Sequence, residues 1–167
     1  MYRLFGAAAL LFSTYIFGRA FTSELRRRPE QLRQLIDALE HLRAEIAELM
    51  PLGDALRQVS ICAEGFVQEF FRELAQRMEM ENARFHALWE AGIETLQFLR
   101  PSEQRILMAL GTQLGRFDAA SQLRALDRCI EELTKCKMEA KDKARAEAGL
   151  RLRLTAALGV LLLIMIW

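Results

Sequence analysis

The chain has 167 residues, a formal net charge of +1 and a hydrophobic fraction of 52%. This length suits one domain, and the near-neutral charge gives no global attraction to nucleic acid or to acidic substrates. Only three prolines and nine glycines are present, and helix-forming residues dominate, so we expect an all-α fold. Cys62, Cys129 and Cys136 form no close-pair motif. We expect them to be reduced thiols in a cytosolic compartment that fill helix faces.

Two uncharged apolar stretches lie near the ends of the chain, Leu4–Gly18 and Leu154–Trp167. As helices both are shorter than the hydrocarbon core of about 30 Å, but flanking arginines that reach the interface lengthen them. We therefore predict an N-terminal transmembrane helix within residues 1–25 and a C-terminal one within residues 150–167. Arginine and lysine gather on the inner flank of each stretch, which predicts that the domain between them, residues 28–148, is cytoplasmic.

Two other interpretations of the apolar stretches remain open. Arg3, the apolar run after it and the small residues around Arg19 also resemble a cleaved signal peptide, although the arginines that follow oppose export. Alternatively, both stretches are core helices of a globular domain. The flanking arginines favour membrane spans over this second alternative.

The first part of the domain predicts a long helix that Pro29 opens, since proline is tolerated in a first helical turn. Apolar side chains then recur at spacings of three and four, as in a helix that packs inside a bundle. This stripe consists of Leu32, Leu35, Leu39, Leu42, Ile46 and Leu49. The solvated side carries charged residues, namely Glu40, Arg43, Glu45 and Glu48.

Five further helices are predicted from the breaks that follow. They start at Pro51, after Gly65, near Phe85, at Pro101 or Ser102, and after Asp118. In the fifth, Gly111 and Gly115 share a face on which a neighbouring backbone can approach closely, and Gly115 also suits a helix C-cap. Asp118 is placed to cap the last helix with its carboxylate. Beyond Cys136 the apolar face of that helix thins, which predicts an exposed stalk.

No set of residues in the sequence predicts catalysis. His41 and His86 stand on charged helices without carboxylate or cysteine partners at metal-ligand spacing, and no glycine-rich phosphate loop follows a strand. Neither a nucleophile–base pair nor a metal geometry can be assembled. We expect no enzyme activity, no cofactor, no metal, no nucleic-acid partner and no small-molecule substrate.

The order of short motifs resembles the stage III sporulation protein AB family over essentially the whole chain. The first half carries the resemblance in Arg28-Pro29, Gln31-Leu32-Arg33-Gln34-Leu35, Ala38-Leu39, Leu42, Glu45-Ile46, Pro51-Leu52 and Ala55-Leu56. The second half carries it in Leu110-Gly111, Leu114-Gly115, Asp118, Gln122 and Leu158-Gly159-Val160. Three departures stand out: Phe117 replaces a serine, Leu161 and Leu162 replace glycines, and the turn before Pro51 lacks a tyrosine and a glycine.

The resemblance implies a six-helix antiparallel bundle similar to the platform domain of type II secretion and type IV pilus systems, flanked by transmembrane helices. It implies a non-enzymatic scaffold subunit of the channel between mother cell and forespore in endospore formers. The location would be the mother-cell side of the outer forespore membrane. The partners would be other stage III channel proteins, with a secretion-type ATPase among the candidates. Candidate interaction or structural residues are Glu45, Glu48, Gly111, Gly115, Asp118 and Gln122.

A membrane-tethered coiled-coil adaptor in signalling or stress response, unrelated to sporulation, is the alternative function. A compact six-helix domain would favour the scaffold, whereas one long extended hairpin would favour the adaptor.

Overall fold

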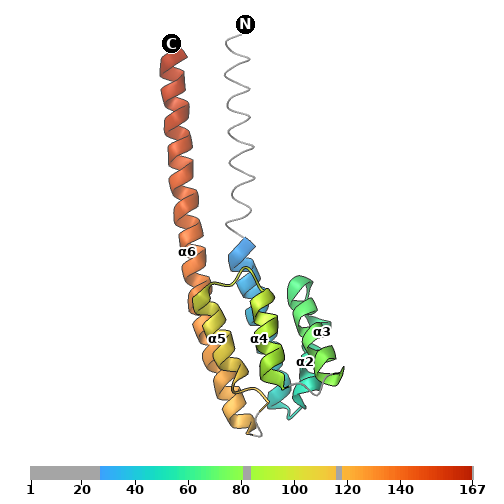
Figure 1. The fold of residues 1–167 in the computed structure, drawn as a ribbon. Helices are drawn as coiled ribbons and strands as arrows, with labels where there is room; N and C mark the ends of the chain where they lie inside the picture. The colour runs from blue at the N-terminus through green and yellow to red at the C-terminus, as the bar shows by residue number, and fades with distance from the viewer. Residues whose placement is uncertain (1–26, 81–83, 116–117, 167) are drawn as a thin grey trace. The chain divides into compact units, whose positions relative to one another are not determined.

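The structure is a computed structural model that describes residues 27–80, 84–115 and 118–166. Within these residues the chain forms six helices and no strands, so the expected all-α fold is confirmed (Figure 1). The first helix covers residues 27–47. It is followed by α2 (Leu52–Cys62), α3 (Gly65–Met80), α4 (Phe85–Thr95), α5 (Pro101–Gly111) and α6 (Ala119–Ile166).

Residues Glu30–Lys137 form a compact unit, which we call the helical domain, and the residues before and after it belong to a second unit. Consecutive helices of the domain pack on one another, α2 on α3, α3 on α4 and α4 on α5. A compact unit of packed helices is the outcome expected of the scaffold interpretation, and it differs from the single extended hairpin expected of a coiled-coil adaptor.

Within the described residues, no helix is both long enough and apolar enough to cross a membrane. This finding does not support the C-terminal span predicted over residues 150–167, where α6 continues to Ile166. The N-terminal span predicted within residues 1–25, and the signal peptide weighed against it, lie outside the described residues.

The apolar stripe of the first helix forms one wall of the core, as its spacing predicts. Leu32, Leu35, Leu39, Leu42 and Ile46 are all buried. The prediction is wrong for the last member, because Leu49 is 79% exposed. The helix ends at residue 47, and the chain turns away before Leu49 can follow the stripe. The prediction that Pro29 opens the helix is also wrong, since residues 27 and 28 are already helical.

Aromatic side chains from α3 and α4 fill the centre of the domain. Trp89 is completely buried and meets the rings of Phe70 and Phe85 at centroid distances of 5.5 and 5.6 Å. Its indole N–H donates a hydrogen bond of 2.7 Å to the carbonyl of Leu107 in α5, which satisfies the one polar atom of the ring. One side chain therefore joins α3, α4 and α5.

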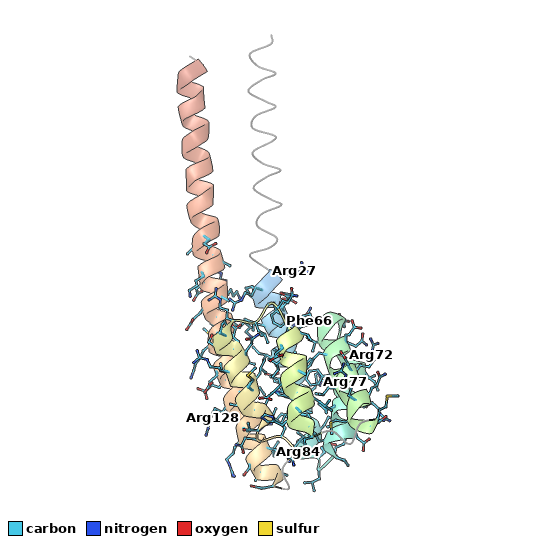
Figure 2. All side chains as sticks on the ribbon, viewed as in Figure 1. Arg27, Phe66, Arg72, Arg77, Arg84 and Arg128 are labelled. Carbon is cyan, nitrogen blue, oxygen red and sulfur yellow. The ribbon has the colours of Figure 1, made fainter. Side chains whose placement is uncertain are left out.

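Consecutive helices of this aromatic core run in opposite directions. Phe66, at the start of α3, packs edge-on against Phe98, which follows the end of α4, with ring centroids 4.8 Å apart. Figure 2 shows Phe66 at the end of the domain opposite to Arg84, the residue before α4. The domain therefore has two distinct ends, and the connections between helices alternate between them.

The end of α4 is a further correction to the expected boundaries. The sequence predicts apolar helical spacing as far as Leu99, but α4 ends at Thr95. Leu96 and Leu99 remain buried in the connection to α5. The residue before a proline is disfavoured in the helical conformation, so Pro101 prevents the two helices from joining through Arg100.

Candidate functional site

The structure brings candidate residues at the end of the first helix, Glu45 and Glu48, to the same end of the helical domain as Gly115 and Asp118. A Cβ atom built on Gly115 would lie 3.6 Å from Cδ2 of Leu52 and 3.9 Å from Cδ1 of Phe85. The turn before α2, the start of α4 and the turn between α5 and α6 therefore adjoin one another. We call this region the turn end and define it by residues 45–54, Arg84-Phe85 and residues 112–115 and 118. Glu48 and Asp118 both belong to it, and Figure 2 shows Arg84 at this end.

The first helix ends in a C-cap with one residue in the left-handed backbone conformation, and this cap leads into α2. The amide of Met50 donates to the carbonyl of Glu45 at 3.2 Å, and the amide of Leu49 donates to that of Ile46 at 3.0 Å. These two bonds, together with a φ of 62° at Leu49, define a Schellman motif whose left-handed position usually holds glycine. Leu49 is the only non-glycine residue with positive φ among those the structure describes.

Glu45 and Glu48 occupy different environments beside this cap. Glu48 is exposed in the turn, whereas Glu45 is half-buried in the last turns of the helix. The next arginines on either side are already paired, Arg43 with Asp127 of α6 and Arg57 with Glu79 of α3. No lysine or arginine lies between Arg43 and Arg57, so the immediate sequence around the cap is acidic.

Gly111 is buried, and it serves packing inside the domain. A Cβ atom at this position would lie 2.9 Å from Nε1 of Trp89 and closer still to Cδ1. Close approach was predicted, but the neighbour is an indole ring rather than a backbone. Gly115 does not share a helix face with Gly111, because α5 ends at Gly111 and Gly115 adopts a φ of 78° in the turn beyond. Gly115 is not the C-cap of α5 either, since Thr112 takes that position, and the left-handed φ of Gly115 belongs to the turn that follows.

Asp118 caps α6, as the sequence predicts. Its carboxylate accepts a hydrogen bond of 3.1 Å from the amide of Ala120 and another from the hydroxyl of Ser121. The guanidinium of Arg124 lies 3.8 Å from Oδ2 of the same carboxylate. The hydrogen bond from Ser121, the backbone donors and the charge of Arg124 together hold the pKa of Asp118 below its usual value. Gln122 is buried one turn later. Its backbone N–H donates a hydrogen bond of 3.2 Å to the backbone carbonyl of Asp118.

We predict that Asp118→Ala lowers the melting temperature at pH 7, because the first turn of α6 loses its carboxylate acceptor. A carboxyl whose pKa is lower in the folded state stabilises the fold above its unfolded pKa, and this contribution disappears as the pH falls through the folded pKa. The difference in melting temperature between wild type and variant should therefore shrink below about pH 4. Thermal unfolding followed by circular dichroism from pH 7 to pH 3 tests this, and a difference that stays constant over that range would contradict it.

The three cysteines lie in different environments, and one histidine lies beside a carboxylate. Cys129 is buried, as expected of a cysteine on a helix face, and burial raises the pKa of its thiol to about 12. Cys62 departs from that expectation because it is exposed, while Cys136 is half-buried. The prediction that His86 has no carboxylate beside it is wrong, because its Nδ1 lies 3.4 Å from Oε2 of Glu90, one turn later on the same helix. No group of three potential metal ligands occurs among the described residues.

Sequence reasoning missed three residues that shape this region. Leu49 was assigned to the core, although the absence of a glycine before Pro51 was a signal that another residue must take the left-handed position. Glu103 is 2% exposed and accepts a hydrogen bond of 2.8 Å from the amide of Arg100, which caps α5. Its position three residues after Arg100 matches the spacing of a capping box, which the sequence alone shows. The packing of Trp89 against Gly111 had no local signal.

Comparison with known proteins identifies the family of this fold. The family model described as stage III sporulation protein AB matches residues 3–167. A protein of that name from Bacillus subtilis (strain 168) is 28% identical over 171 aligned residues, which cover 99% of each chain. A solved structure of stage III sporulation protein AB (SpoIIIAB) superposes with a TM-score of 0.64 at 25% identity, covering 71% of this chain and 97% of that one. These relatives carry the name of a sporulation protein and not that of an enzyme. The chain therefore belongs to the stage III sporulation protein AB family.

Proposed function

We propose that this chain is a non-enzymatic scaffold subunit of a channel complex required for endospore formation. Membership of the family supports the role in sporulation. One observation supports the scaffold role: Glu48, Gly115 and Asp118, three of the candidate residues, belong to the turn end of a compact helical domain, whereas Gly111 and Gln122 are buried inside it. Such a surface suits the docking of other channel proteins and of a secretion-type ATPase, as in the platform domains that the family resembles.

We further propose that the apolar stretches near both ends of the chain hold the domain at a membrane. The support is the uncharged sequence of Leu4–Gly18 and Leu154–Trp167 and the basic residues on their inner flanks. The helical domain would then lie in the mother-cell cytoplasm, on the side of the outer forespore membrane.

The role in sporulation is tested by deleting the gene in its own sporulating host and counting heat-resistant spores. The proposal expects the deletion to lower the count sharply and the wild-type gene to restore it. Normal spore counts after deletion would refute the proposed function.

Cys62 provides the test of membrane side. Its thiol is exposed, whereas Cys129 is buried with a pKa of about 12, so Cys62 is expected to react far faster with maleimides. In intact cells, we expect a membrane-permeant maleimide to label the protein and an impermeant one to leave it unlabelled. The Cys62→Ser variant identifies the signal from this residue. Labelling of Cys62 by the impermeant reagent in intact cells would place the domain outside the cytoplasm and contradict the proposal.

A further inference from the structure

Leu49 has two features that do not stabilise the folded domain, a left-handed backbone conformation and an exposed apolar side chain. It holds a left-handed backbone conformation, which costs non-glycine residues free energy relative to glycine. Its side chain is 79% exposed, so little burial offsets that cost. Exposed apolar side chains that stand singly are ordinary on protein surfaces. A leucine at a cap position that favours glycine is different, because both glycine and asparagine would relieve the strain and remove the exposed apolar surface.

Leu49 lies in the turn end, where its side chain can contact a binding partner. It is three residues from Leu52, whose side chain adjoins Gly115 and hence the turn before α6. The two hydrogen bonds of the Schellman motif fix the backbone on either side of Leu49. Its side chain is therefore presented on a rigid turn, which lowers the ordering cost of binding.

Charge around the turn indicates the chemistry of the surface that would cover this side chain. Glu45, Glu48 and Asp54 flank Leu49 within five residues, and the flanking arginines beyond them are paired to other carboxylates. Arg84 lies at the same end, and Arg124 lies there beside the carboxylate of Asp118. A complementary partner therefore carries lysine or arginine around an apolar socket.

We propose that Leu49 is the apolar anchor of a docking contact with another protein of the channel complex, one that presents a basic rim around an apolar socket. This proposal rests on the proposed function, since it specifies how the turn end binds. The strain at Leu49 is retained because the side chain is buried when the partner is bound. Binding and stability then place opposite demands on this position.

These opposite demands give a decisive experiment with Leu49→Gly and Leu49→Asn. Both variants should melt about 4 °C higher than the wild type, because they relieve the left-handed strain. For binding, p-benzoylphenylalanine is placed at the exposed Ala47 of the full chain in its sporulating host, and the photo-crosslinked adduct is mapped by mass spectrometry. The adduct yield should fall about tenfold in both variants, since a buried leucine contributes at least that factor to an association constant. The crosslinked partner peptide should carry lysine or arginine.

Two controls separate anchoring from general apolar exposure. Leu49→Met keeps an apolar side chain and should keep the adduct. Ile61 is 66% exposed near the end of α2, close to the opposite end of the domain, so Ile61→Ser should also keep it. An adduct unchanged in Leu49→Gly, or an adduct with a second copy of this chain, would overturn the proposal. A normal spore count in the deletion strain would instead refute the proposed function itself, so the two failures are distinguishable.

Discussion

Gly111→Ala should lower the free energy of unfolding by about 3 kcal/mol. The added methyl group would lie within 3 Å of the indole of Trp89. That ring cannot retreat easily, because it is completely buried, packs against Phe70 and Phe85, and is tied to the carbonyl of Leu107. Either the indole moves and loses its hydrogen bond, or α5 separates from α4. Urea unfolding of the full chain, followed by circular dichroism, measures the loss.

A matched control for this substitution exists in α2. Gly53 also lies in a helix, but a Cβ atom there would meet nothing within 4 Å. Gly53→Ala should therefore leave the stability unchanged or raise it slightly, since alanine is the better helix former. Equal effects of the two substitutions would show that Gly111 matters for backbone freedom and not for the space beside Trp89.

The second large effect is expected from reversing the charge of Glu45 and Glu48 together by substitution with lysine. Neither residue belongs to the buried core, so helical content and melting temperature should stay close to those of the wild type. Reversed charges would face the basic rim of the docking partner, and like charges across an interface cost several kcal/mol. We expect co-purification of the channel proteins from sporulating cells to fall at least about tenfold.

Glu64 and Glu94 provide the matched reversal at the opposite end of the domain. Both are exposed, Glu64 directly before α3 and Glu94 near the end of α4. Substituting these two with lysine changes the net charge by the same amount but should leave co-purification intact. If the Glu45 and Glu48 reversal also leaves it intact, the turn end is not the docking surface. If both pairs reduce it equally, the effect comes from overall charge.

The sequence predicted the fold well where the signal is local. The spacing of Leu32 to Ile46 identified a buried face, and Pro51, Gly65 and Pro101 marked real breaks between helices. Asp118 was recognisable as a cap because its carboxylate accepts a hydrogen bond from the backbone amide of a residue only two positions later. Such features depend on helical geometry alone, so the chain order is enough to reveal them.

The errors arose where two patterns compete or where the partner is distant in sequence. Leu49 fits the apolar stripe, but the helix ends before it, and the cap places it in solvent. The sequence around Gly115 is compatible with a helix face as well as with a turn, and its left-handed φ of 78° shows that it lies in a turn. The adjacency of Gly115 to Leu52 and Phe85 joins segments that are 63 and 30 residues apart. No local pattern contains that information, and the turn end therefore became visible only in the folded domain.

The central claim is that the turn end of this family member docks channel partners during spore formation. The most direct measurement is the count of heat-resistant spores in the deletion strain that carries the Glu45 and Glu48 reversal, compared with the Glu64 and Glu94 reversal. With equal protein levels, we predict that the first strain resembles the deletion and that the second resembles the wild type. Full spore counts in both strains would contradict the account.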